Sequence, residues 1–158
     1  MKIRVGFGFD VHQLKEGNNL WLGGIELSHT KGTVGHSDAD VLIHAICDAL
    51  LGAAGMRDIG FHFPDTSGEF KNIDSKILLA RVMELLKNEN YSIGNVDCTL
   101  VLENPKINPH IDTMKKTLAA ILNIEINDIG IKATTNEKMG YVGREEGVCA
   151  YAVVLIQK

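Results

Sequence analysis

The chain has 158 residues, of which 45% are hydrophobic, a formal net charge of -4 at pH 7 and a pI near 5.8. This length predicts a single domain over residues 1–158, because it supports one hydrophobic core and leaves too little chain for two. The acidic balance argues against nucleic-acid binding through a broad basic surface, and no apolar run approaches the roughly 18 residues that cross a membrane.

The first predicted element is a strand over residues 3–12, where apolar residues alternate with other types. Side chains in a strand alternate between two faces, so Asp10 and His12 share one face. The opposite face carries Ile3, Val5, Phe7, Phe9 and Val11. Residues 18–33 contain three glycines around two short apolar runs and predict a hairpin followed by a loop at the edge of the sheet.

A helix is predicted to begin near Ser37, with Ser37 as its cap and Asp40 as the acidic residue of a capping box. It ends at the glycines Gly52 and Gly55. His44 lies four residues from Asp40 and four from Asp48, so the three share one stripe of the helix. These two carboxylates are therefore candidates to orient the imidazole of His44.

Residues 56–72 show no periodicity and predict a long loop, which in a compact domain is typical of a functional or mobile segment. Further helices are predicted over residues 74–88 and from Pro109 or His110 to Leu122. Strands are predicted over residues 96–103, 129–135 and 148–156, with loops at 104–109 and 136–147. This order predicts an α+β fold, a mixed β-sheet with helices on one face. The uncovered face and the apolar last strand predict a homo-oligomer.

Cys47, Cys98 and Cys149 are widely spaced in apolar stretches, which predicts buried free thiols and no disulfide framework or metal site. The start of the chain shows no charged segment followed by an apolar one, as a secretion signal would. We therefore expect a cytoplasmic protein, or one of a plastid-type organelle if a transit peptide has been removed.

Asp10, His12 and His44 form the first candidate site. One carboxylate and two imidazoles are zinc ligands, and three protein ligands leave a position open for water or substrate, as in catalytic zinc sites. Spacing alone does not show that the three converge. The alternative is that each is an ordinary hydrogen-bonded polar residue.

Three loops are further candidates. Glu137 can share a divalent cation such as Mg²⁺ with phosphate oxygens, while Lys138 and Arg144 can hold phosphates. The rigid Pro- and Asn-rich segment 104–109 can present backbone groups to a base, and the carboxylates and aromatic rings of residues 58–65 suit polyol hydroxyls. The alternative for each is an ordinary solvated loop.

Taken in order, these segments resemble the 2-C-methyl-D-erythritol 2,4-cyclodiphosphate synthase family of the non-mevalonate isoprenoid pathway. The motifs cover nearly the whole chain: GFDVH at 8–12, HSDAD at 36–40, DIG at 58–60, FPD at 63–65, PK at 105–106, ATT at 133–135 and GREEG at 143–147. The chain departs from the family pattern at Asn136 and Tyr141, where Thr and Phe are frequent. Neither change removes a proposed ligand.

The resemblance implies a homotrimer with active sites between subunits and with the sheets packed around the three-fold axis. It implies Zn²⁺, or another divalent cation, on Asp10, His12 and His44, and Mg²⁺ or Mn²⁺ on Glu137 at the diphosphate. The implied catalytic residues are Asp10, His12, His36, His44, Thr135 and Glu137. The implied substrate-binding residues are His36 and Ser37 at a phosphate, Asp58, Gly60 and Asp65 at the methylerythritol, Pro105 and Lys106 at the cytosine, Thr134 and Thr135 at phosphate and nucleotide, and Lys138, Tyr141 and Arg144. Arg144 and Glu146 would line an axial channel for an isoprenoid diphosphate.

The implied activity is that of a phosphorus-oxygen lyase. It converts 4-diphosphocytidyl-2-C-methyl-D-erythritol 2-phosphate to 2-C-methyl-D-erythritol 2,4-cyclodiphosphate with release of CMP. The 2-phosphate attacks the β-phosphorus of the same molecule, and divalent cations neutralise the charge of both groups. Two alternatives remain open: a zinc hydrolase that activates water, and a trimeric module that binds nucleotide or isoprenoid diphosphate without turnover.

Overall fold

Strand β1 (Ile3–Glu16) is the longest strand and lies second in a five-stranded sheet of order β4-β1-β7-β5-β6. The structure, a computed structural model, describes residues 1–158. The other strands of this sheet are β4 (Lys31–Val34), β5 (Ser92–Val101), β6 (Ile129–Thr134) and β7 (Gly147–Gln157). β5 and β6 run parallel and all other neighbours are antiparallel, so the sheet is mixed, as predicted.

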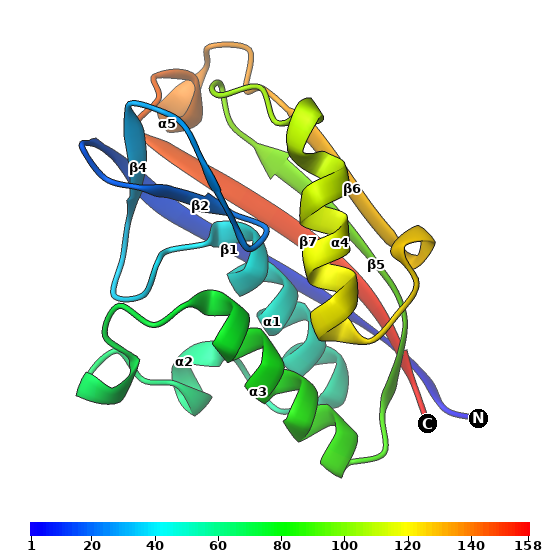
Figure 1. The fold of residues 1–158 in the computed structure, drawn as a ribbon. Coiled ribbons are helices and arrows are strands. Elements are labelled where there is room, and N and C mark those ends of the chain that lie inside the picture. The colour runs from blue at the N-terminus through cyan, green and yellow to red at the C-terminus, as the bar shows by residue number, and fades with distance from the viewer.

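Three helices cover one face of the sheet (Figure 1). They are α1 (Val41–Ala54), α3 (Ser75–Asn88) and α4 (Ile111–Leu122). Helix α1 lies directly on β1 and β7, and α3 packs against its other side. Leu42, Ile46 and Leu50 of α1 are therefore fully buried in the main hydrophobic core. The predicted α+β arrangement with helices on one face is confirmed.

Residues 18–33 form the predicted hairpin and also the first three residues of a strand, β4, that was not predicted. Strands β2 (Leu20–Leu22) and β3 (Ile25–Leu27) form the predicted hairpin as a separate two-stranded sheet. Strand β4 then pairs with the end of β1, from Gln13↔Val34 to Glu16↔Lys31. This pairing supplies hydrogen bonds beyond His12, so β1 extends further than its alternating pattern predicts.

The two long segments predicted as loops contain short helical turns. Residues 56–72 contain α2 (Ile59–His62) and a 3-10 turn at Gly68–Phe70, and residues 136–147 contain α5 (Gly140–Gly143). Further 3-10 turns lie at Asn108–His110, before α4, and at Ile126–Asp128. In the first segment, Asp58 and Ser67 accept backbone N–H groups of the turns that follow them. Such local hydrogen bonds form a single turn without hydrophobic periodicity.

The helix that carries His44 begins later than predicted, at Val41. Its N-cap is Asp40, whose backbone is extended and whose carboxylate accepts the Ile43 N–H at 3.0 Å. The prediction of Ser37 as the cap is wrong, because its hydroxyl oxygen accepts the Ala39 N–H instead. The predicted helix over residues 74–88 is confirmed as α3, with Asp74 as its N-cap.

Strand β1 approaches α1 at a distance that only glycine allows. A Cβ atom on Gly6 would lie 1.9 Å from the carbonyl oxygen of Ala49, and one on Gly8 would lie 1.9 Å from that of Ala45. Gly6 and Gly8 share the strand face of Asp10 and His12, since the four positions are separated by even numbers of residues. The same close approach therefore places that face of the strand against the helix that carries His44.

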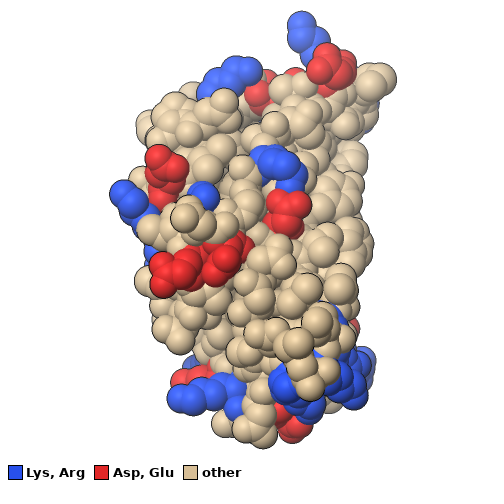
Figure 2. Space-filling model, turned by 90° about the vertical axis from the view of Figure 1, so that its right-hand side faces the viewer, with Lys and Arg blue, Asp and Glu red and all other residues tan.

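The sheet face away from the helices exposes apolar side chains. Phe7 is 63% exposed, and Ile3, Val5, Phe9 and Val11 of β1 and Tyr151 and Val153 of β7 are also exposed. In Figure 2, charged side chains lie at the upper and lower ends, toward the left and in one group near the middle, while the right-hand side is free of them over most of its height. An exposed apolar surface of this kind on β1 and β7 is typical of an interaction surface.

All three cysteines are free and buried, as predicted. Burial raises the pKa of the Cys98 thiol to about 12, so this side chain stays protonated and behaves as a small apolar group. No helix combines the length and the apolar character that crossing a membrane requires.

Replacing Gly8 with alanine should lower the free energy of unfolding by about 3 kcal/mol, because the new methyl group has to displace the backbone of α1. Gly52→Ala is the matched control, since a Cβ atom there meets nothing within 4 Å. It should raise the free energy of unfolding by about 1 kcal/mol through helix propensity. Urea denaturation measures both changes. A Gly8→Ala protein as stable as the wild type would contradict the close approach.

Candidate metal centre and substrate pockets

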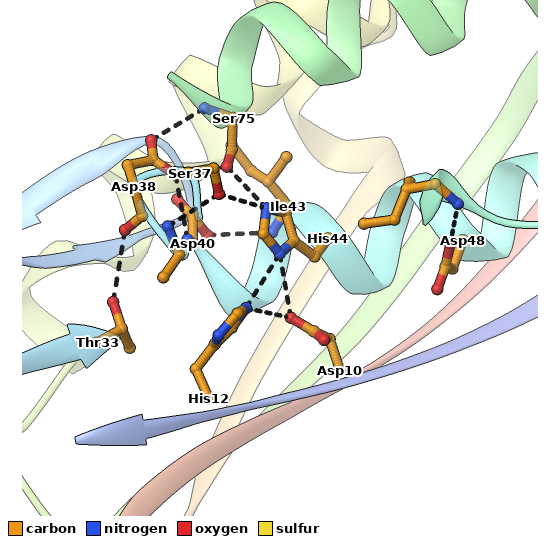
Figure 3. A network of polar contacts seen from close by, with 12 residues as sticks. Asp10, His12, Thr33, Ser37, Asp38, Asp40, Ile43, His44, Asp48 and Ser75 are labelled. Atoms are coloured by element: carbon orange, nitrogen blue, oxygen red, sulfur yellow. Dashed lines mark hydrogen bonds and ion pairs between the residues drawn. The ribbon is translucent and has the colours of Figure 1, made fainter. Parts of the chain in front are cut away.

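The structure brings the three predicted metal ligands together (Figure 3). His12 Nε2 lies 3.0 Å from Asp10 Oδ2 and 3.1 Å from His44 Nδ1, and His44 Nδ1 lies 3.2 Å from Asp10 Oδ2. Zinc bonds of about 2.0–2.1 Å in a tetrahedron place ligand atoms about 3.3 Å apart. The three donor atoms therefore fit one face of the coordination shell of a tetrahedral ion and leave the fourth position open.

The tautomer of His12 also favours a cation between the two imidazoles. His12 Nδ1 lies 3.0 Å from the carbonyl oxygen of Val34, which only accepts, so this nitrogen carries the ring proton and leaves a lone pair on Nε2. That lone pair faces His44 Nδ1 at 3.1 Å. A proton or a metal ion between these two nitrogens would satisfy the lone pair of His12 Nε2. The chemistry of the donor set thus fits a divalent metal ion.

The charges at this site shift two pKa values. Burial raises the pKa of Asp10, but the hydrogen bonds and charges of His12 and His44 outweigh burial and lower it to about 2. Burial lowers the pKa of His12, but the hydrogen bond and charge of Asp10 outweigh burial and raise it. The metal-free site therefore favours an Asp10–His12 ion pair, and an incoming metal ion has to displace the proton.

The carboxylates predicted to orient His44 do not contact its ring. Asp40 accepts the backbone N–H groups of Gly23, Gly24 and Ile43, and Asp48 accepts that of Ile59 at 2.8 Å. The prediction that they orient the His44 ring is wrong, because both carboxylates accept hydrogen bonds from nearby backbone N–H groups instead.

Two serine hydroxyls contact the His44 ring instead. His44 Nε2 lies 3.2 Å from Ser37 Oγ and 2.9 Å from Ser75 Oγ. Sequence analysis does not find Ser75, because it lies 31 residues away at the start of α3 and no local pattern signals the contact. Its position directly after the capping residue Asp74 is the only trace in the sequence.

A pocket of about 250 Å³ opens beside the donor atoms. It is lined by the three ligands, by the predicted substrate residues His36, Ser37, Gly60 and Asp65, and by apolar side chains that include Ile59, Phe63 and Phe70. Asp58 does not line this pocket; its carboxylate caps α2 by accepting the Phe61 N–H at 2.9 Å. The structure thus groups four predicted substrate residues with the metal ligands.

A second pocket, of about 150 Å³, is lined by the predicted residues Pro105, Lys106, Thr134 and Thr135. It shares no lining residue with the first pocket. Glu103 also lines it, and its carboxylate accepts the backbone N–H of Asn136 at 2.8 Å. Sequence analysis does not single out Glu103; its place at the end of a predicted strand is the only signal.

The remaining predicted residues line neither pocket. Glu137 and Lys138 adopt left-handed backbone conformations, with φ of 51° and 61°. Glu137 Oε1 lies 3.4 Å from Thr135 Oγ1, which keeps it at the edge of the second pocket. Tyr141 is partly exposed in α5, and Arg144 forms a two-bond ion pair with Glu146 at 2.9 and 3.0 Å.

Comparisons with known proteins agree over the whole chain. The model of the YgbB family matches residues 3–157. The 2-C-methyl-D-erythritol 2,4-cyclodiphosphate synthase of Bacteroides thetaiotaomicron is 65% identical over 158 residues, 100% of this chain and 99% of that protein. The bifunctional IspDF of Campylobacter jejuni has a TM-score of 0.94 and 38% identity over 98% of this chain, which spans only 42% of that longer chain. A CDP complex of IspF from Plasmodium falciparum has a TM-score of 0.86 and 35% identity, covering 98% of this chain and 95% of that chain.

In the metal-free protein, the Asp10–His12 pair should stabilise the fold within a pH window. Asp10 contributes fully above its ordinary pKa of 3.8, and its contribution is lost as the pH falls to about 2. His12 contributes fully below its ordinary pKa of 6.5, and its contribution is lost as the pH rises through its raised pKa. Between these limits, we expect the metal-stripped wild type to be more stable than Asp10→Asn by about 2 kcal/mol.

Urea denaturation of both proteins in the presence of a chelator, across this window and beyond both ends, measures the difference. A stability difference that stays constant with pH would contradict the ion pair.

Proposed function

The chain belongs to the YgbB family, and we propose that it is a 2-C-methyl-D-erythritol 2,4-cyclodiphosphate synthase of the non-mevalonate isoprenoid pathway. Acting as a single cytoplasmic domain, it would convert 4-diphosphocytidyl-2-C-methyl-D-erythritol 2-phosphate to the 2,4-cyclodiphosphate and CMP. The observation that carries the proposal is the open triangle of Asp10, His12 and His44 donor atoms beside a pocket lined by His36 and Ser37.

The proposed reaction is an intramolecular phosphoryl transfer. An oxygen of the 2-phosphate forms a bond to the β-phosphorus, and the bond from that phosphorus to the CMP oxygen breaks. The attacking phosphate has a second pKa near 6 and is largely ionised at pH 7, so the protein needs no general base. Divalent cations held by Asp10, His12 and His44 and by Glu137 would act as Lewis acids on the phosphate oxygens. The protein itself contributes positioning and charge complementarity.

Residues of the first pocket would hold the phosphorylated polyol. His36 and Ser37 lie next to the metal ligands in the lining, where ring N–H and hydroxyl groups can donate to a phosphate oxygen. Gly60 and Asp65 line the same pocket and would contact the methylerythritol hydroxyls. Asp58 would contribute from the N-terminus of α2, which it already caps.

Residues of the second pocket would hold the nucleotide. The hydroxyls of Thr134 and Thr135 can bind phosphate, and the backbone around Pro105 and Lys106 can bind the edge of cytosine. Lys138, Tyr141 and Arg144 follow in the same loop and would add positive charge and an aromatic wall. The CDP complex of the Plasmodium falciparum relative supports a cytidine-linked ligand.

We also propose a homotrimer in which two subunits complete each active site. The family resemblance supports active sites between subunits, in which a substrate that joins a nucleotide to a phosphorylated polyol would occupy the first pocket of one subunit and the second pocket of its neighbour; the two pockets are lined by different residues. The exposed apolar face of β1 and β7 would supply the contact surface. Arg144 and Glu146 would then line an axial channel suited to an isoprenoid diphosphate.

Phosphorus NMR of the protein with the cytidyl substrate and Mg²⁺ or Mn²⁺ tests the reaction. We expect one cyclic diphosphate for each CMP released. Release of inorganic phosphate would instead indicate a hydrolase, and unchanged substrate would indicate a binding module.

His44→Ala should lose bound zinc, and its rate of CMP release should fall at least a hundredfold, since an imidazole ligand is removed. His29→Ala, a histidine outside both pockets, is the matched control and should keep both.

The mass of the protein in solution tests the assembly. Sedimentation should give the mass of three chains, each 17.3 kDa. Phe7→Asp places a charge on the exposed sheet face, so we expect it to give single chains and to lose CMP release. Ile77→Asp is the control, because Ile77 is also exposed, at 48%, but lies on α3 in the helix layer. A trimeric Phe7→Asp protein would contradict the proposed interface.

A further inference from the structure

We propose that Ser75 and Asp38 are positioning residues of the metal centre, which hold the His44 ring in the tautomer that presents an unprotonated Nδ1 to the metal. This inference rests on the metal site of the proposed function but concerns residues outside the ligand set. Figure 3 shows the chain of contacts, from Asp38 through Ser75 to the side of the His44 ring away from Asp10 and His12.

The Ser75 hydroxyl donates its hydrogen bond to Asp38. Ser75 Oγ donates to Asp38 Oδ1 in a short contact, and the Ser75 backbone N–H donates to Asp38 Oδ2 at 2.9 Å. A carboxylate only accepts hydrogen bonds, so the direction of both contacts is settled. Ser75 is completely buried, so no water competes for its hydroxyl.

The direction of that bond decides the tautomer of His44. With its proton given to Asp38, Ser75 Oγ can only accept from His44 Nε2, which lies 2.9 Å away. Nε2 therefore carries the ring proton, and Nδ1 keeps the lone pair that faces Asp10 and His12. The remaining neighbour, Ser37 Oγ at 3.2 Å, then keeps its own proton free for the pocket.

Asp38 also fixes the loop that carries the phosphate-facing residues. The backbone N–H of Asp38 donates to the carbonyl of Ile73 at 3.1 Å, and that of Asn72 donates to the carbonyl of His36 at 2.7 Å. Residues 36–38 are thus joined to the start of α3 by backbone and side-chain bonds together. The ring orientation of His44 and the position of His36 and Ser37 therefore depend on the same contacts.

Two substitutions test the chain of contacts. Ser75→Ala removes the nearer acceptor of the Nε2 proton and leaves Ser37 Oγ at 3.2 Å, and loss of such a partner typically weakens metal binding by about 10- to 100-fold. Asp38→Asn keeps the volume but introduces a donor. The amide oxygen would keep the bond to the Ser75 N–H, which can only donate, and the amide nitrogen would donate to Ser75 Oγ, which can also accept. Ser75 would then donate to His44 Nε2 and favour the wrong tautomer, so we expect a loss of zinc affinity at least as large.

Zinc affinity is measured by competition with a chromophoric chelator, and the tautomer by the nitrogen chemical shifts of the His44 ring in ¹⁵N-labelled protein. Neither measurement needs substrate or turnover. We expect a protected Nε2–H signal in wild-type protein, a less protected one in Ser75→Ala, and a shift of the proton toward Nδ1 in metal-free Asp38→Asn. Ser92→Ala is the matched control, since Ser92 Oγ donates to the Gln157 carbonyl, at the other end of β5 from the pocket residues.

Urea denaturation of the metal-free variants separates positioning from folding. If Ser75→Ala and Asp38→Asn lose stability but bind zinc and hold the ring proton as the wild type does, the inference is overturned. It is also overturned if the wild type binds no zinc, or if its His44 carries the proton on Nδ1. Normal zinc binding without formation of a cyclic diphosphate would contradict the proposed function and leave this inference standing.

Discussion

The approach of β1 to α1 is the contact on which the candidate site depends. At Gly6 and Gly8 the strand runs so close to the helix that a methyl group would overlap carbonyl oxygens of the helix. Two and four residues beyond Gly8 on the same strand face, Asp10 and His12 lie within hydrogen-bond distance of His44. A larger residue at either glycine would move the strand outward and separate the carboxylate and imidazole of β1 from the imidazole of α1. Backbone packing, and not the ligands themselves, therefore brings the donor atoms together.

The alternation of side chains along β1 also determines its other face, which is apolar and exposed. Pairing with β7 fixes the register at Asp10↔Ala150 and His12↔Val148, and a slip of one residue would exchange the two faces. With this register, the polar ligands point at the helix and Phe7 and Phe9 point away from it. One strand thus links the metal centre to the apolar face, so association of subunits through that face would directly constrain the strand that carries two ligands.

Sequence patterns predicted the parts of the site that local periodicity determines. The shared face of Asp10 and His12 follows from the two-residue period of a strand, and the buried cysteines follow from their apolar neighbours. Whether His44 meets them depends on how β1 and α1 pack, and spacing does not contain that information. Ser75 was out of reach for the same reason, because its partners come from a distant loop. The cap of α1 was misassigned because the serine three residues before Asp40 fits the local motif equally well.

The contacts of Asp38 and Asp40 could not be predicted from the local sequence, because the two carboxylates bind different parts of the fold. Asp40 is fully buried, and although burial raises its pKa, the backbone N–H groups of Gly24, Ile43 and Gly23 oppose that rise. Asp38 instead binds Ser75 of α3. Ala39 between them has a φ of 56°, a left-handed conformation that costs a non-glycine residue energy and persists only when its surroundings impose it. Hydrogen bonds on both sides impose it here. The strained turn directs the carboxylates of Asp38 and Asp40 to different elements, and Ser37 and the His44 ring both line the same pocket.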